Sequence, residues 1–443
     1  MSPAPAGEAA AWVREIEIEL TLHDQARNRY VPVPFTVPEG MTSLGVQLEV
    51  DDPDCADGPA LIDLGCDGAA GWRGWSGGAR RDFVITADDA TPGYLPGPLE
   101  AGRWAVVLGV HALPAARATA RVHLRSPACS RPDHGPRPSP SPRAVRGSAR
   151  QLPAPEGRRW LAGDTHCHSL HSDGTRSLWQ VAEEGVRSGL DFLCMTDHNT
   201  TSHHSWLPEV AAEHGITLVA GQEVTTHRGH ANAYGDIGFV DFRQNVDQWA
   251  RTVAARGGLL SVNHPVSGDC SWLENVPEGV GGVEILHSDL YRDPLSTAAF
   301  AWTGRLLAER RALGHPVLSM LAGADFHSPD VPVRPGTPTT WVCAEDDTPE
   351  AILHAMKEGR TALTASYHLD EDGAGRPRVL DGPIVLRSDE QTLHVRDARG
   401  HMLVDGGGRR RVIEHEVENV RAPRFAGPYR LETADRRTVA LSA

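Results

Sequence analysis

Three histidines and two aspartates fall within residues 164–173, in the stretch DTHCHSLHSD, directly after an apolar lead-in. Side chains two positions apart on a strand point to the same face, so His166 and His168 would face one cavity at the end of a strand. Paired imidazoles suit a borderline metal such as zinc, iron or manganese. The pair by itself is a weak signal, because two surface histidines give the same pattern.

Ligand-type residues recur at the ends of the strand-like runs that follow. Catalytic residues of β/α barrels gather at the carboxyl ends of several strands, so this recurrence predicts one shared metal site. Histidines are also concentrated there, with 13 of the 22 lying between residues 164 and 330. The later ligand-type residues are Asp197 and His198 in TDHN, Glu223 in GQEVTT, His230 in GHANAYG, His264 in NHP, and Asp325 and His327 in GADFHS.

The runs that carry these residues alternate with helix-like stretches. Alternating β and α units predict a parallel sheet, and seven strands favour a closed or nearly closed barrel. The expected helices cover 177–189, 246–257, 299–314 and 349–360. The expected strands cover 160–166, 191–197, 217–224, 231–237, 258–265, 282–288 and 316–327.

The regions on either side of this barrel have different patterns. Residues 1–126 contain short alternating runs such as VREIEIELTL, separated by Gly, Pro and Asp clusters, and predict an antiparallel β-sandwich. Residues 127–157 are rich in Pro, Ser and Arg and predict a semi-extended linker. The barrel is expected over 158–375, and a small β appendage over 376–443.

The composition excludes several classes of function. A formal charge of −15 opposes unspecific nucleic-acid binding, which depends on neutralising phosphates. No run of about 18 apolar residues predicts a membrane span, and the first 20 residues lack the pattern of a secretory signal. Seven scattered cysteines without a CxxC pair argue against a disulfide framework, so we expect a cytoplasmic protein. We also expect its substrate to be a small molecule.

The ordered motifs DTHCHSLHSDG, TDHNT, GQEVTT with GHANAYG, NHP and GADFHS resemble those of the PHP (polymerase and histidinol phosphatase) superfamily of metal-dependent hydrolases. The preceding β-rich region, with PGYLPGPLEAGRWAVVLG, resembles the branch that includes carbaryl-type carbamate hydrolases and many phosphoesterases. The resemblance implies an α/β protein with a distorted (β/α)7 barrel. It also implies a cleft that holds two or three divalent ions of zinc, manganese or iron.

The resemblance further implies an assignment of ligands, with Glu223 as the bridge between two metals. Asp173 stands where some members of the superfamily have histidine. Asp164 and Asp197 are expected to orient ligand histidines. The first metal would take His166, His168, Glu223 and Asp325, the second Glu223, His230 and His264, and the third Asp173, His198 and His327.

The expected reaction is hydrolysis of a small phosphoester by a metal-bound hydroxide, with Glu223 and Asp325 as catalytic residues. Arg228 and Arg176 are candidate clamps for a phosphate, and His227 and His203 are candidate proton donors to the leaving group. Each of these four is also compatible with an ordinary loop residue. The same site could instead cleave an amide, ester or carbamate. A third hypothesis is a non-catalytic protein that binds a carbohydrate or a partner.

Overall fold

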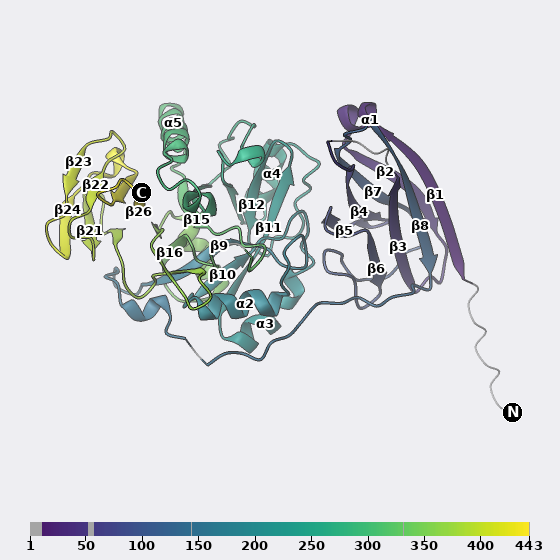
Figure 1. Ribbon diagram of the computed structural model, residues 1–443, viewed down its shortest axis with the longest axis horizontal. Helices are drawn as coiled ribbons and strands as arrows, with labels where there is room; N and C mark the ends of the chain where they lie inside the picture. Colours follow the sequence, from purple (N-terminus) through teal and green to yellow (C-terminus); the bar gives the residue numbers. More distant parts are fainter. Residues whose placement is uncertain (1–10, 52–56, 143, 331, 443) are drawn as a thin grey trace. The chain divides into compact units, whose positions relative to one another are not determined.

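The computed structural model describes residues 11–51, 57–142, 144–330 and 332–442. The chain forms two compact units (Figure 1). The first runs to His134 and adds the short segment His171–Asp173, while the second contains Gly135–Leu170 and the chain from Gly174 onward. All residues expected to bind metal, apart from Asp173, belong to the second unit.

The first unit consists of two four-stranded antiparallel sheets around one hydrophobic core, and the predicted antiparallel strands are confirmed. Side chains from most of these strands enter the core, among them Leu20 and Trp104. The sheet orders are β1-β8-β3-β6 and β2-β7-β4-β5, and α1 (Leu22–Arg27) follows the first strand. The strands are β1 (Trp12–Thr21), β2 (Tyr30–Val37), β3 (Ser43–Asp51), β4 (Leu61–Gly68), β5 (Gly71–Gly77), β6 (Asp82–Thr86), β7 (Gly102–Ala112) and β8 (Arg117–Ser126).

The second unit is built on a large mixed sheet in which seven consecutive strands, β9 to β15, are neighbours in chain order. Each of the seven expected strands is present. Pairing is parallel from β9 to β11 and again from β13 to β15. The bounds are β9 (Arg159–Cys167), β10 (Phe192–Met195), β11 (Thr217–Thr226), β12 (Gly229–Tyr234), β13 (Leu259–Val262), β14 (Gly282–His287) and β15 (Ser319–Gly323).

The expectation of a uniformly parallel sheet is wrong at β12, which runs antiparallel to both β11 and β13. Only His227 and Arg228 separate β11 from β12, and Thr226 pairs with Gly229. A loop of two residues can join only antiparallel strands, because a parallel connection needs a dozen residues or more. Gly229 has a φ of 122°, and an added Cβ there would lie 2.7 Å from the Trp272 ring, so the turn requires glycine.

The last of these strands returns to the first. Thr165 Oγ1 in β9 donates a hydrogen bond to Ala322 O in β15 at 3.0 Å, and His168 N donates to Phe326 O at 2.9 Å. The buried carboxylate of Asp164 also accepts backbone N–H groups from three segments. These donors are His166 N (2.9 Å), Ala324 N (3.1 Å) and Gly336 N (2.6 Å). The strand ends that carry the predicted ligands are therefore brought together.

The four helices expected in the second unit are present, together with α3, which was not expected. Three of them begin with side-chain caps, from Ser177 in α2, Asn245 in α4 and Thr348 in α6. Helices α2 and α3 pack on each other (Figure 1). The helices are α2 (Leu178–Arg187), α3 (Leu207–His214), α4 (Val246–Ala255), α5 (Ala298–Leu313) and α6 (Pro349–Lys357).

The described residues in the later part of the expected linker, 135–142 and 144–157, belong to the second unit. Leu152 is buried in its core, Trp160 Nε1 donates to Pro153 O at 2.9 Å, and Arg150 Nη2 lies 2.7 Å from Asp397 Oδ2. This polar, proline-rich segment is therefore extended, and its few apolar residues attach it to the second unit.

The C-terminal region continues the β-structure. Strands β16 (Thr339–Ala344) and β17 (Thr361–Thr364) extend the large sheet from β9, and β26 (Thr438–Ser442) pairs with β17. Among the described residues, no helix combines the length and apolar character needed to cross a lipid bilayer. The remaining strands are β18 (Tyr367–Leu369), β19 (Gly375–Pro377), β20 (Ile384–Arg387), β21 (Thr392–Arg396), β22 (Met402–Val404), β23 (Arg410–Val412), β24 (Val417–Arg421) and β25 (Tyr429–Glu432).

Candidate metal centre

The carboxylate of Glu223, on β11, is fully buried and surrounded by imidazole rings. Five histidine nitrogens from different strand ends lie within 3.5 Å of its two oxygens. Such convergence around one carboxylate is the arrangement that a bridging metal ligand requires. Oε1 is 3.3 Å from His166 Nε2, 3.2 Å from His230 Nδ1 and 3.4 Å from His264 Nε2, and Oε2 is 3.5 Å from His168 Nε2 and 2.8 Å from His198 Nδ1.

Asp325, which follows β15, supplies a second carboxylate to the same centre. Its Oδ1 lies 2.9 Å from His168 Nε2, 3.2 Å from His166 Nε2 and 3.5 Å from His327 Nδ1. Its Oδ2 lies 3.2 Å from His287 Nε2. His166 and His168 are therefore held between the two carboxylates.

Several groups of donor atoms are close enough to hold metal ions, and His264 falls in groups with Glu284 and with His287 rather than with Glu223 and His230. The group of His166, His168, Glu223 and Asp325 has ligand atoms within 4.8 Å of one another and matches the first set that the family resemblance implies. The second group combines Glu223 and His230 with His198, whereas the sequence placed His198 with the third metal. His168, His198 and His327 also gather. Asp173 belongs to the first unit, so its role as a ligand remains a prediction.

The donor set fits divalent metal ions. Several buried atoms that face the centre have no hydrogen-bond partner among the described residues. Unsatisfied buried polar atoms are costly, and a cation between them would compensate each one. A mixture of imidazole and carboxylate is the coordination that zinc, manganese and iron accept. These atoms are His166 Nε2, Glu223 Oε2, His230 Nδ1 and Asp325 Oδ1.

The protonation states of Glu223 and His168 favour metal binding. Burial would raise the pKa of Glu223, but His166, His198 and His230 outweigh it and hold this pKa well below its usual range. Burial, together with the neighbouring rings of His327 and His198, lowers the pKa of His168 to about 4. An ionised carboxylate and a neutral imidazole are the forms that coordinate metal, so neither side chain must lose a proton.

Two further residues near the centre were missed in the sequence. Glu284, on β14, is buried, with Oε1 3.1 Å from His166 Nδ1 and Oε2 accepting a hydrogen bond from His264 N at 3.0 Å. It thereby orients His166 so that Nε2 faces Glu223. His287 ends the same strand and contacts Asp325. The run at 282–288 ends at His287, so applying the strand-end rule to it would have found His287, whereas Glu284 lies inside the strand.

Asp164 and Asp197 accept hydrogen bonds from the segment that carries His166 and His168, and their expected role of orienting ligand imidazoles stays a prediction. Asp197 accepts hydrogen bonds from Ser169 N at 2.8 Å and from Ser169 Oγ at 2.9 Å. Asp164 accepts the N–H of His166 itself. Both fix the chain on which His166 and His168 stand.

The backbone is strained at two proposed ligands. His264 has a φ of 24° and Asp325 a φ of 51°, in the left-handed region that side chains with a Cβ rarely adopt. Residues held in such conformations tend to cluster at functional sites, where the surrounding structure enforces them. The strain here coincides with the strand ends that turn donor atoms inward.

Comparison with known proteins gives short or distant similarities. No family model matches the chain. Over 64 residues the chain is 34% identical to phosphoribosyl 1,2-cyclic phosphate 1,2-diphosphodiesterase of Eggerthella lenta and, equally, to a 5'-3' exoribonuclease of Haemophilus influenzae. These matches cover 14% of this chain. The chain spans about a quarter of the length of these curated relatives, 24% and 23% respectively.

Among solved structures, a two-domain protein of Bacteroides vulgatus matches with a TM-score of 0.41 and 21% identity. That protein is described as containing a predicted PHP-like metal-dependent phosphoesterase. The match covers 68% of this chain and 99% of that one. The chain is similar to PHP-like metal-dependent phosphoesterases. An amidohydrolase of Chromobacterium violaceum also matches, with a TM-score of 0.27 and 16% identity over 38% of this chain and 88% of that one.

The four residues expected to touch substrate occupy different settings. Arg228 and His227 are exposed in the turn between β11 and β12, and Arg228 forms an ion pair with Glu274. Arg176 is half-buried immediately before the cap of α2. His203 does not fit the expected role, because its ring is fully buried and Nε2 lies 3.1 Å from Met195 O and 3.0 Å from Gly221 O.

Replacing Glu284 by glutamine is expected to weaken metal affinity by about 10- to 100-fold, the usual effect of losing a carboxylate that orients a ligand histidine. The amide keeps the size of the side chain but removes the charge beside His166 Nδ1. Competition with a chelating dye measures the change. Glu278→Gln, at an exposed position before the same strand, is the control. Equal metal affinity in the two variants would contradict this role.

Proposed function

We propose that this chain is a metal-dependent hydrolase of the PHP superfamily that cleaves a small phosphoester, with β9 to β15 as a distorted seven-stranded barrel. The observation that carries the proposal is the buried carboxylate of Glu223, with five imidazole nitrogens within 3.5 Å. A structural role alone gives no reason to concentrate so many metal-binding donors around one buried charge. The bond broken would be a P–O ester bond.

The residues of the centre have distinct tasks in this proposal. Glu223 would be a shared ligand of two ions, and Asp325 and His168 would be further ligands of the first. When bound, the two or three ions of zinc, manganese or iron would supply a nucleophilic water at neutral pH and neutralise charge on the phosphoryl group. Glu284 keeps His166 in the orientation that coordination needs.

Two further observations support phosphoester chemistry. The matched proteins of Eggerthella lenta and Haemophilus influenzae are, by name, a diphosphodiesterase and an exoribonuclease. The metal ions would also provide the positive charge that an acidic chain otherwise lacks for an anionic substrate.

The six described cysteines are free thiols, which fits the proposed cytoplasmic location.

A substrate panel tests the proposal. With manganese or zinc bound, kcat/KM for p-nitrophenyl phosphate or bis(p-nitrophenyl) phosphate is expected to exceed that for 1-naphthyl methylcarbamate by at least ~100-fold, or about 2.7 kcal/mol of transition-state stabilisation. The reason is that a cluster of cations stabilises a phosphoryl group, which carries charge in the ground state, more than a neutral carbamate. Each assay is repeated with Asp325→Asn as the inactive reference.

The panel also separates the competing chemistries. Turnover of the carbamate alone would identify a carbamate hydrolase and overturn the phosphoester proposal. Turnover that persists in Asp325→Asn at the wild-type rate would show that the reaction occurs elsewhere.

A further inference from the structure

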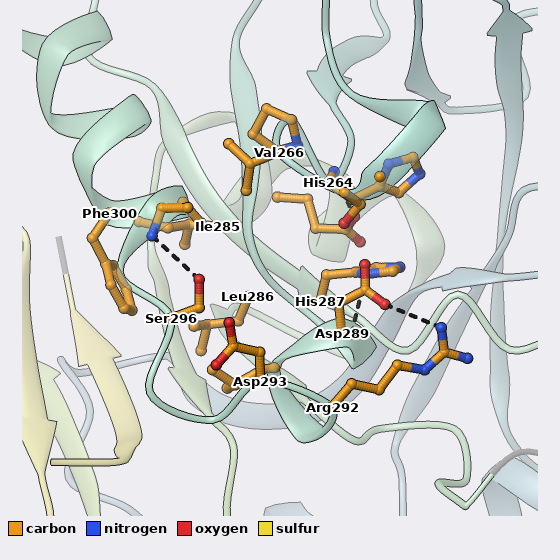
Figure 2. A pocket seen from close by; sticks show the side chains of 17 residues that line it. His264, Val266, Ile285, Leu286, His287, Asp289, Arg292, Asp293, Ser296 and Phe300 are labelled. Atoms are coloured by element: carbon orange, nitrogen blue, oxygen red, sulfur yellow. Dashed lines mark hydrogen bonds and ion pairs between the residues drawn. The ribbon is translucent and has the colours of Figure 1, made fainter.

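A cavity of about 280 Å³ lies next to the metal centre, within the second unit (Figure 2). Three of its lining residues, His264, Glu284 and His287, also belong to the groups of donor atoms around the centre. The imidazoles of His264 and His287 are close neighbours, with ring centroids 4.9 Å apart. The cavity therefore adjoins the position where a substrate would react.

The wall farther from the metal centre is largely apolar. It includes Val266, after β13, and Leu290 and Phe300, from the segment that leads into α5 and from its first turn. Val266 keeps 36% of its surface exposed. Exposed apolar side chains that line a concave site beside a polar centre are typical of pockets that bind the apolar part of a small molecule.

Two aspartates that line the cavity differ in whether a cationic group lies beside their carboxylates. The carboxylate of Asp289 lies 3.6 Å from His287 Nδ1 and 3.7 Å from Arg292 Nη1, so two cationic or polar groups share it. Asp293 also lines the cavity, and its carboxylate forms no ion pair within the part of the chain that the structure describes. An uncompensated negative charge therefore faces any group that enters this cavity.

We infer that this cavity receives the leaving alcohol of the substrate and selects an apolar alcohol that is uncharged or positively charged. The inference rests on the proposed phosphoesterase function. Hydrolysis forms a P–O bond to the oxygen of water and breaks the bond to the alcohol oxygen, which takes up a proton. The alcohol must leave from the side of the centre where there is space, and this cavity provides that space beside His264 and His287.

Two features argue for this class of alcohol. Val266, Leu290 and Phe300 give an apolar alcohol a surface that excludes water. The carboxylate of Asp293 would repel a second anionic group and attract an amine. Leaving groups of a polyanionic kind, such as a nucleotide chain, are therefore disfavoured at this position.

The first test uses two phosphonates that are not hydrolysed, 4-(aminomethyl)benzylphosphonate and 4-(carboxymethyl)benzylphosphonate, with the manganese- or zinc-loaded full chain. We expect the amine to bind at least ~5-fold more tightly, a modest ratio because Asp293 lies near solvent, which screens its charge. Asp293→Asn is expected to reduce this preference at least twofold, and Asp247→Asn, at an exposed position on α4, to leave it unchanged. Equal binding of the two phosphonates by the wild-type chain would overturn the charge preference.

The second test fills the cavity. Val266→Phe is expected to weaken binding of the benzylphosphonates by about 10-fold, equivalent to about 1.4 kcal/mol, while inorganic phosphate binds as before. Val317→Phe, at another exposed valine of the same unit, is the matched control. If Val266→Phe binds the benzylphosphonates as tightly as the wild type, the alcohol does not enter this cavity.

Binding and turnover separate this inference from the function on which it rests. If the chain discriminates between the phosphonates but turns over no phosphoester, the binding preference of the cavity is supported and the proposed reaction is rejected. Turnover of phosphoesters without discrimination, and without an effect of Val266→Phe, would uphold the reaction and reject the cavity.

Discussion

Replacing Glu223 by alanine is expected to remove metal from the protein and to lower kcat for p-nitrophenyl phosphate by about 1,000-fold or more. The variant loses several kcal/mol of charge stabilisation in the transition state, and each 1.4 kcal/mol lowers the rate about tenfold. The carboxylate lies within 3.5 Å of five histidine nitrogens, so its loss disrupts two coordination sets together. Metal analysis by inductively coupled plasma mass spectrometry, combined with steady-state kinetics, measures both effects.

The matched variants distinguish this role from a general effect on folding. His264→Ala is expected to lose less metal, because His264 contacts only one of the Glu223 oxygens. Glu350→Ala, on the exposed first turn of α6, is expected to keep full metal content and activity. Wild-type metal content and activity in both Glu223→Ala and His264→Ala would contradict the assignment of the centre.

Removing the metal by chelation is expected to abolish phosphoesterase activity and to lower the midpoint of thermal unfolding by roughly 5–10 °C. A ligand present at 100 times its Kd stabilises the folded state by about 2.7 kcal/mol, and each kcal/mol shifts the midpoint by about 2–4 °C in a domain of this size. The physical cause is the set of buried donors, including Glu223 Oε2 and Asp325 Oδ1, that then lack a cation. Differential scanning calorimetry before and after chelation measures the shift.

Restoring the metal is the control for this experiment. Zinc or manganese is expected to recover both the unfolding midpoint and the activity, whereas magnesium, which prefers oxygen ligands, is expected to recover less. An unfolding midpoint that is the same with and without metal would mean that these donors do not bind an ion in the folded protein.

The sequence predicted which segments form strands but not the direction of each. Periodicity and composition located all seven strands from β9 to β15, because buried strands are apolar runs bounded by turn residues. The direction of β12 depends on the length of the loop before it. Thr226 pairs with Gly229, so the loop between the two strands has only two residues. The sequence pattern did not show that the loop is this short.

The sequence also predicted most of the centre, since strand ends at one edge of a sheet converge. Glu284 escaped because it lies inside β14 rather than at its end, and only the structure shows that its carboxylate reaches His166 Nδ1. The burial of His203 could not be foreseen either. Its position beneath β10 and β11 depends on how the segment after TDHNT folds back, which no local pattern records.

The backbone contacts of Asp164 have a consequence for biosynthesis. This carboxylate joins its own strand to amides that follow it by 160 and 172 residues. At roughly 5–20 residues per second, a ribosome needs about 10–30 s to add that length of chain. For that interval a nascent polypeptide displays His166 and His168 without Asp325, so complete coordination of the ions must await the synthesis of Asp325.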